Sequence, residues 1–224
     1  MSQRRSLFSP SDLARIEAAV GEAEARSRGE IVVAAVPASG RYAGAVWAGA
    51  CLGSLAALTG LVLAHWLTDL WGLGSPPWAL LAAAGGAVLG YLAVAASDGL
   101  KRRLTADEVM ARQVDVAARA AFVDHEVFAT RDRSGVLIFL SLLEHRVEVL
   151  ADSGIEAHVA PGEWDGIVAG IVRGVREGRP ADALVEAVGR CGEILDRRGL
   201  ERRADDRDEL PDRLRLGGEE VPEP

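Results

Sequence analysis

Two uncharged apolar runs, Tyr42–Ala64 and Trp78–Ser97, dominate the hydrophobic pattern of this 224-residue chain. A helix needs about 20 apolar residues to cross the hydrocarbon core of a bilayer, and both runs reach that length. The connection between them, His65–Pro77, contains a single acidic residue, Asp69, and a Gly-Ser-Pro-Pro turn. The pattern therefore predicts a transmembrane helical hairpin. The alternative, a pair of buried core helices, is weaker because core helices rarely carry such long apolar runs.

Charged and aromatic residues around the two runs predict the orientation of the hairpin. Arg41 precedes the first run and Lys101, Arg102 and Arg103 follow the second, whereas the connection has no Lys or Arg. Because Lys and Arg concentrate on the cytoplasmic side of a membrane, we expect a two-pass membrane protein with both termini cytoplasmic. Four of the five tryptophans lie near the predicted interfaces, as in an aromatic belt: Trp47, Trp66, Trp71 and Trp78.

Glycines recur one helical turn apart in both predicted spans, as Gly49-x-x-x-Gly53 and Gly86-x-x-x-Gly90. This spacing allows two helix backbones to approach closely in a membrane. We expect these faces to support close helix contact, with self-association of two copies through the transmembrane helices as one outcome.

The segment before the hairpin predicts one helix and one buried strand. Ser9 followed by Pro10 and Asp12 is a capping-box pattern, and the helix that it starts is expected to stop at Gly29. The run Ile31–Val36 is apolar throughout and rich in β-branched residues, which favours a strand buried on both faces.

The segment after the hairpin predicts a helix followed by two strands. Thr105 and Glu108 form a second capping-box pattern, which starts a helix that reaches about Phe128. One face of this helix is expected to carry Val109, Val116, Ala120 and Val123. The fully apolar segment 136–141 and the alternating segment 146–150 predict an antiparallel strand pair.

Two more helices, over 161–176 and 181–198, complete the predicted elements. In the first of them Trp164 is expected to pack in the core, although a ligand platform is the alternative. Strands joined by a helix-containing crossover pair in parallel, so the fold class is α/β, a small mixed-sheet α/β/α sandwich with an inserted two-helix transmembrane hairpin. The predicted divisions are 1–41 and 98–199 for one α/β domain, 42–97 for the hairpin and 200–224 for a charged, partly disordered tail.

Composition narrows the classes of partner. The net charge is −8, which does not suggest a nucleic-acid surface, because such surfaces are basic. The two cysteines, Cys51 and Cys191, lie far apart in different settings, form no CxxC motif and agree with a reducing compartment.

The central hairpin of strands carries a resemblance to a known family. Residues Ser134–Leu142 and Glu144–Ile155, including the Asp152-x-Gly154 pattern, resemble the signature of the TPM domain family. Arg28–Val33 and Asp208–Pro211 resemble its bacterial membrane-anchored branch, which is related to thylakoid-lumen photosystem II repair proteins. The resemblance implies an α/β/α sandwich, a bacterial plasma membrane as the location and a role in assembling or repairing membrane proteins. This chain differs from the better-known members because its membrane segment lies within the domain rather than at a terminus.

Clustered carboxylates are the candidate chemistry of the domain. The chain contains no nucleophile elbow, P-loop, dinucleotide fingerprint or His/Cys metal motif. In the predicted sheet, however, Glu30, Asp132 and Asp152 lie near one edge, where they could hold calcium or magnesium and orient a phosphate ester. The alternative is that all three are ordinary turn and capping residues. At the opposite edge, Glu144, His145 and Arg146 are expected to form a polar hairpin turn.

Two functions follow from these observations. The first is a membrane-anchored interaction module that faces the cytoplasm, with the lipid bilayer and other membrane proteins as partners and no catalytic residue. The second is a divalent-metal-assisted phosphatase that uses Glu30, Asp132 and Asp152. The histidines do not indicate a further catalytic site, because all four lie in unrelated segments: His65, His125, His145 and His158.

Overall fold

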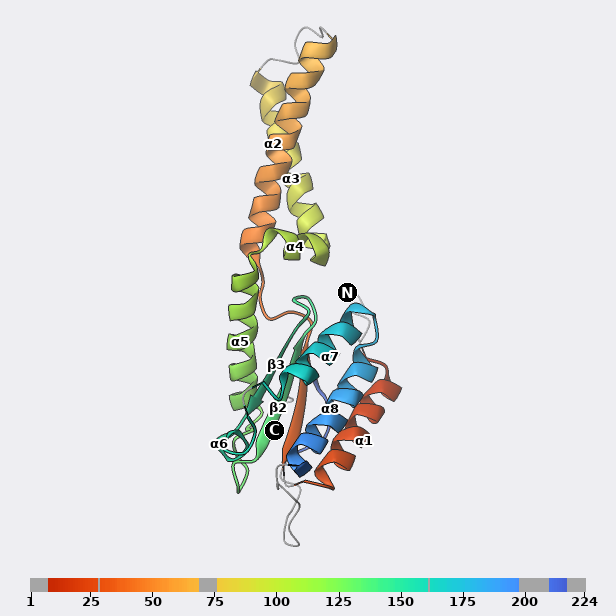
Figure 1. The fold of residues 1–224 in the computed structure, drawn as a ribbon. Coiled ribbons are helices and arrows are strands. Elements are labelled where there is room, and N and C mark those ends of the chain that lie inside the picture. The colour runs from red at the N-terminus through yellow and green to blue at the C-terminus, as the bar shows by residue number, and fades with distance from the viewer. Residues whose placement is uncertain (1–7, 28, 69–75, 161, 198–209, 217–224) are drawn as a thin grey trace, which may run out of the picture. The chain divides into compact units, whose positions relative to one another are not determined.

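The computed structural model describes five stretches of the chain, residues 8–27, 29–68, 76–160, 162–197 and 210–216 (Figure 1). Contacts divide the chain into two compact units. The α/β domain comprises Met1–Ser39 and Ala111–Pro224, and the hairpin unit comprises Gly40–Met110. The hairpin unit extends past the predicted boundary at 97 because a short helix, α4 (Asp98–Leu104), packs against both long helices of the hairpin.

A four-stranded mixed sheet lies at the centre of the α/β domain, in the order β3-β2-β1-β4. β1 (Glu30–Val36) and β2 (Gly135–Ser141) are parallel, and β3 (Arg146–Ala151) is antiparallel to β2. β4 (Arg215–Leu216) pairs in parallel with β1. The predicted pairing of the first three strands is therefore confirmed. The two central strands read as uninterrupted apolar runs because helices cover both of their faces.

Three helices cover the first face of the sheet: α1 (Pro10–Glu24), α7 (Asp165–Arg176) and α8 (Pro180–Arg197). They form the larger hydrophobic core with the strand residues that point toward them, such as Ile31, Val33 and Ile138. Cys191 of α8 lies in this core, where burial raises the pKa of its thiol to about 12. This thiol is therefore a packing group and not a nucleophile.

The start of α1 follows the predicted capping box. The Ser9 hydroxyl accepts the backbone N–H of Asp12 at 3.1 Å, and the Asp12 carboxylate accepts the N–H of Ser9 at 2.9 Å. These hydrogen bonds from Ser9 are the main reason that the pKa of Asp12 is lowered. The predicted stop at Gly29 is wrong, since α1 ends at Glu24. The chain turns earlier because the Glu24 carboxylate accepts the N–H of Ile31, which brings β1 back alongside the helix end.

One helix, α5 (Asp107–Asp124), packs against the second face of the sheet. Its inward residues Val114 and Ala118 meet Leu137 and Phe139 of β2 in a smaller core. Helices therefore cover both faces of the sheet, and the predicted α/β/α sandwich is confirmed.

The second predicted capping box is wrong. α5 begins at Asp107, two residues after Thr105, and Thr105 terminates α4 instead. The Thr105 hydroxyl donates to the carbonyl oxygen of Lys101 at 2.7 Å. A threonine side chain can bond to a preceding helical carbonyl as well as to a following N–H. The capping-box pattern therefore predicted the wrong role for Thr105.

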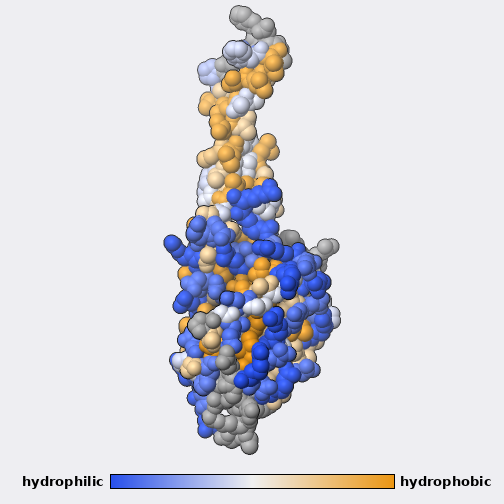
Figure 2. Space-filling view, viewed as in Figure 1, coloured by the Kyte–Doolittle hydropathy of each residue, from blue (hydrophilic) through white to orange (hydrophobic). Residues whose placement is uncertain are grey.

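In the hairpin unit, α2 (Ala43–Thr68) and α3 (Pro76–Ala96) pack against each other as antiparallel helices. Both helices are long and apolar enough to cross a membrane. Their residues are mostly exposed, with 17% of the apolar window of α2 and 11% of that of α3 buried. Figure 2 accordingly shows a hydrophobic surface along these helices. A soluble core helix would be mostly buried, so the exposure favours a lipid environment.

Glycines make the contact between α2 and α3 close. A Cβ on Gly86 would lie 2.3 Å from the carbonyl oxygen of Gly53, and one on Gly90 would lie 2.1 Å from that of Gly49. The predicted glycine faces therefore meet each other within one chain. Self-association through the transmembrane helices stays a prediction, and it would have to use other faces.

The C-terminal tail adds to the sheet. We expected 200–224 to be partly disordered, but Leu210 and Leu214 are buried in the two cores. Arg215 and Leu216 then pair with Ala34 and Ala35 of β1. The many charged residues in 200–224 made the short spacing of the two buried leucines hard to recognise in the sequence. The remainder of the tail prediction falls outside the described residues.

Candidate interaction surface

The three predicted metal ligands do lie at one end of the sheet. Glu30 begins β1 opposite Gly135 of β2, Asp132 precedes β2, and Asp152 directly follows β3. The N–H of Asp152 donates to the carbonyl oxygen of Gly135 at 2.9 Å, which joins the end of β3 to the start of β2. The strand pairing therefore produces the expected neighbourhood.

Each carboxylate whose contacts are resolved is engaged by the protein itself. One Glu30 oxygen accepts the N–H of Leu210 at 3.3 Å. Asp152 caps the short helix α6 (Ser153–Glu156), and its second oxygen lies 3.1 Å from Nε of Arg133 as an ion pair without hydrogen-bond geometry. Within the described residues no three acidic, His or Cys side chains are grouped so that they could hold a metal ion. These contacts favour turn and capping roles, and the calcium or magnesium site stays a prediction.

A buried polar cluster lies at the other end of the sheet, where β1 and β2 finish. The Glu144 carboxylate accepts the N–H of Ser39 at 2.9 Å and the hydroxyl of Ser141. The two serine hydroxyls are 2.7 Å apart, and Glu144 is only 6% exposed. We predicted a polar hairpin turn here, and the residues do form a turn, but the burial of Glu144 was missed. The cluster joins the chain leaving β1 to the β2–β3 turn, which is a structural role.

α5 has a second apolar face that is not used by the core. Val116 and Val123 are each 59% exposed, and Ala120 between them is exposed as well. These residues, with Val109, share one face as the spacing predicts, and the structure shows that this face points to solvent. Isolated exposed apolar residues are ordinary, but a continuous stripe on one helix marks a contact surface.

A groove of about 390 Å³ begins at this stripe. Its lining comes from α5, from β3, from α6 and from the residue before α7: Arg119, Phe122, Val123, Val149, Leu150, Ala151, Glu156 and Trp164. α5 covers one face of the sheet, whereas Trp164 packs against the core on the other face. The groove therefore lies across the outer edge of β3.

Within the described sheet β3 is an edge strand, paired only with β2. Unpaired N–H and C=O groups of such an edge can bind an extended segment as an additional strand. Side chains of the added strand would enter the groove beside Val149 and Leu150. We refer to the groove around Val123, Val149, Leu150 and Trp164 as the β3 groove.

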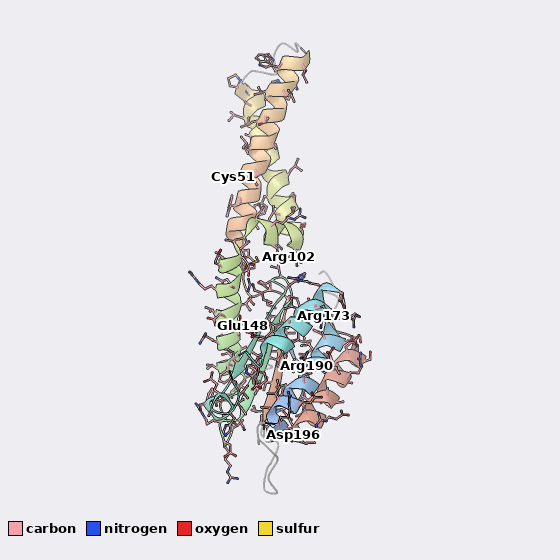
Figure 3. All side chains as sticks on the ribbon, viewed as in Figure 1. Cys51, Arg102, Glu148, Arg173, Arg190 and Asp196 are labelled. Carbon is pink, nitrogen blue, oxygen red and sulfur yellow. The ribbon has the colours of Figure 1, made fainter. Side chains whose placement is uncertain are left out.

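Glu148 adds a carboxyl group beside this groove, on the part of β3 that faces α5 (Figure 3). Its pKa is raised, mainly because burial disfavours the charged form, and the nearby carboxylate of Asp115 adds to the shift. Arg146 and Arg119 oppose the shift. Because burial is the main cause of this shift, a partner that covers the edge strand would raise the pKa of Glu148 further.

Glu148→Gln is expected to raise the unfolding free energy of the α/β domain at neutral pH by less than about 1 kcal/mol. The folded chain binds a proton at Glu148 more tightly than the unfolded chain, so stability falls as pH rises from the ordinary glutamate pKa through the raised one. The advantage of the glutamine variant should therefore grow across that window and disappear below it. Hydrogen exchange of β2 peptides in the full chain measures it, and Glu148→Asp, which keeps the ionisation, should retain the wild-type dependence. Equal pH profiles for wild type and Glu148→Gln would contradict this account.

Part of this surface was predictable from the sequence. Trp164 was expected in the core, and it is half-buried there while also lining the β3 groove. The sequence showed the helical repeat of the valine stripe, but it did not show that this face of α5 points to solvent.

The histidines of the domain have local structural roles. His158, exposed at the end of α6, bonds through Nδ1 to the carbonyl oxygen of Gly154, which is a local turn contact. The lowered pKa of His125, caused mainly by burial and by Arg215, is a packing effect at the end of α5.

Comparison with known proteins identifies the fold and leaves the family open. No family model matches the chain, and no curated protein matches it. Among solved structures, the NMR structure of the BA42 protein from the psychrophilic bacterium Bizionia argentinensis is similar, with a TM-score of 0.59 and 18% sequence identity. The match covers 97% of this chain and 100% of BA42. At this identity the likeness supports the α/β architecture alone.

Proposed function

We propose that this chain is a membrane-anchored interaction module of the TPM type. The helical hairpin anchors it in a bacterial plasma membrane with both termini in the cytoplasm, and the α/β domain binds other membrane proteins during their assembly or repair. The β3 groove carries the proposal, because it combines an open strand edge, an apolar lining and a neighbouring exposed valine stripe.

The membrane part of the proposal rests on three observations. α2 and α3 have the length and apolar composition of membrane spans and expose most of their apolar residues. Trp47 packs edge to face on Tyr91, with ring centroids 5.8 Å apart, near the end of the hairpin from which the chain enters and leaves. Aromatic residues prefer the membrane interface, and cationic residues flank this same end of the hairpin unit, at Arg41 and in α4.

The binding part of the proposal rests on the form of the β3 groove. A volume of about 390 Å³ suits a few side chains of an extended segment rather than a large ligand. Backbone pairing along β3 would provide affinity, and Phe122, Val149 and Trp164 would select apolar side chains. An enzymatic role has weaker support, because the described carboxylates at the other sheet end are engaged in capping and ion pairing.

Site-specific photo-crosslinking in intact cells tests this function. A benzophenone amino acid at Val123 should give discrete adducts with membrane proteins, identified by mass spectrometry. The matched probe at Glu193, an exposed position on α8 across the sheet, should not give these adducts. Val149→Arg, which places a charge in the groove, should reduce the Val123 adducts at least tenfold. Identical adducts from both probe positions, or adducts that persist in Val149→Arg, would refute the β3 groove as the binding surface.

A further inference from the structure

The register of β3 shows which of its backbone groups face the outer edge of the sheet. The N–H of Asp152 donates to the carbonyl oxygen of Gly135, so these two residues form a hydrogen-bonded pair. Hydrogen-bonded and non-hydrogen-bonded pairs alternate along an antiparallel ladder. By this alternation the N–H and C=O groups of Val147, Val149 and Ala151 point away from β2. An added strand would therefore pair with these three residues.

The two faces of β3 would give an added strand different surroundings. The residues with outward backbone groups turn their side chains to the larger core, against which Trp164 also packs. Side chains alternate along a strand, so Glu148 and Leu150 face α5, where Leu150 packs against the smaller core. A side chain of the added strand beside Leu150 would meet apolar groups, whereas one beside Glu148 would meet a carboxyl group.

The charge that the β3 groove offers to a partner is acidic. Arg119 of the lining already forms an ion pair with Asp115, with Nε 2.9 Å from Oδ1. Glu156 of the lining and Glu148 beside it form no salt bridge with any residue that the structure describes. Two carboxylates are thus left to interact with a partner, one at the edge strand and one on α6.

The surroundings of Glu148 favour a cationic neighbour (Figure 3). Its pKa is raised by burial and further by Asp115 of α5, and the opposing effects of Arg146 and Arg119 do not cancel this shift. The ionised carboxylate is therefore incompletely compensated by the protein itself. An apolar side chain placed over it would raise the pKa further, whereas a lysine or arginine beside it would favour the ionised form.

We propose that the β3 groove binds an extended basic and apolar segment, of the kind that flanks transmembrane helices on the cytoplasmic side. Apolar residues of the segment occupy the groove beside Leu150 and Trp164, and its lysine or arginine residues pair with Glu148 and Glu156. Cytoplasmic flanks of membrane proteins are rich in these two cations, so the partner class of the proposed function carries such segments. The inference rests on the proposed function and adds the chemistry of the partner.

Fluorescence anisotropy with the full chain in a nonionic detergent tests this chemistry. Three labelled peptides share an extended, valine-rich sequence and differ only at two positions, which carry lysine, glutamine or glutamate. The lysine peptide should bind about tenfold more tightly than the glutamine peptide, as expected for two opposite-charge contacts between neighbouring strands. The glutamate peptide should bind more weakly than either. Equal affinity for the lysine and glutamate peptides would overturn the inference.

Variants of the two carboxylates assign the preference to this site. Glu148→Gln/Glu156→Gln should bind the lysine and glutamine peptides equally. The control Glu193→Gln/Asp196→Asn removes two exposed acidic residues from α8 and should keep the wild-type preference. A preference that persists in the first variant, or that disappears in the control, would mean that the overall negative charge of the chain selects the peptide.

The lysine and glutamine peptides should also respond to pH in opposite ways. Lysine favours the ionised form of Glu148, so the affinity of its peptide should rise with pH up to the raised pKa and then level off. The glutamine peptide covers the carboxyl without a charge, so its affinity should fall as pH rises through that pKa. Glu148→Gln should remove this difference. Parallel pH profiles in wild type would contradict a pairing at Glu148.

Val149→Arg separates failure of this inference from failure of the proposed function. If all three peptides bind equally and Val149→Arg abolishes their binding, the groove accepts extended segments and only the charge preference is refuted. If no peptide binds although Val123 still gives adducts that Val149→Arg removes, the partner is not an extended segment and the inference alone fails. If both the peptides and those adducts are missing, the proposed function fails as well.

Discussion

Glu144→Ala is expected to lower the free energy of unfolding of the α/β domain by about 3 kcal/mol. The Glu144 carboxylate is buried and accepts the N–H of Ser39 and the hydroxyl of Ser141. Alanine leaves both donors without this acceptor in a site that water does not reach freely. A buried donor that loses its acceptor costs about 1–3 kcal/mol, and hydrogen bonds to a charged group lie at the upper end of that range.

Hydrogen exchange of the full chain measures this loss where it arises. Peptides that cover β2 and the turn from Ser141 to Arg146 should exchange faster in Glu144→Ala, while peptides from α2 and α3 should keep their rates. Glu144→Gln retains a carbonyl acceptor of similar size and should lose less. If exchange in the β2 turn were the same in wild type and Glu144→Ala, the cluster would not hold the two segments together.

This cluster shows why a buried site can be hidden in a sequence. Ser39 and Glu144 are 105 positions apart, and only the parallel pairing of β1 with β2 brings them together. The pairing itself was predictable, because two apolar runs joined by a long crossover pair in parallel. The inward direction of one carboxylate in a turn of charged residues was not, since Glu144, His145 and Arg146 all have the composition of a solvated turn.

The central strands β1 and β2 were predictable because burial of apolar side chains dominates their sequences. β1 and β2 are apolar at every central position, and only a sheet covered on both faces buries such a run. The cap of α1 was predictable for a similar reason, as Ser9, Pro10 and Asp12 agree on one structure. By contrast, the Thr105 hydroxyl could bond either to a carbonyl oxygen of the preceding helix or to an N–H of the following one. The sequence alone did not decide between the two.

The β3 groove lay beyond sequence reasoning for a geometric reason. α5 is rich in alanine and valine around its circumference, so two stripes compete for the core. The sheet accepts the stripe of Val114 and Ala118, whose closely spaced small residues fit against Phe139, and the stripe of Val116 and Val123 is left outside. That choice depends on shapes contributed by β2 and β3. It also creates the surface on which the proposed function depends.

Gly86→Val is expected to separate α2 from α3 and to destabilise the hairpin by about 3 kcal/mol. A side chain at Gly86 would meet the carbonyl oxygen of Gly53 at 2.3 Å and the Cβ of Ala57 at 2.6 Å. A backbone carbonyl cannot rotate away as a flexible side chain can, so the helices must move apart. Overpacking of a close contact costs about 1–3 kcal/mol, and this contact lies at the upper end because backbone opposes it.

Gly85 provides a matched control one position away. A Cβ at Gly85 meets nothing within 4 Å, so Gly85→Val adds the same branched side chain on an exposed side of α3. Spin labels at Gly60 and Leu80, two outward positions on α2 and α3, report the helix separation in a Cys51→Ser background. Gly86→Val should broaden and lengthen their distance distribution, and Gly85→Val should leave it unchanged.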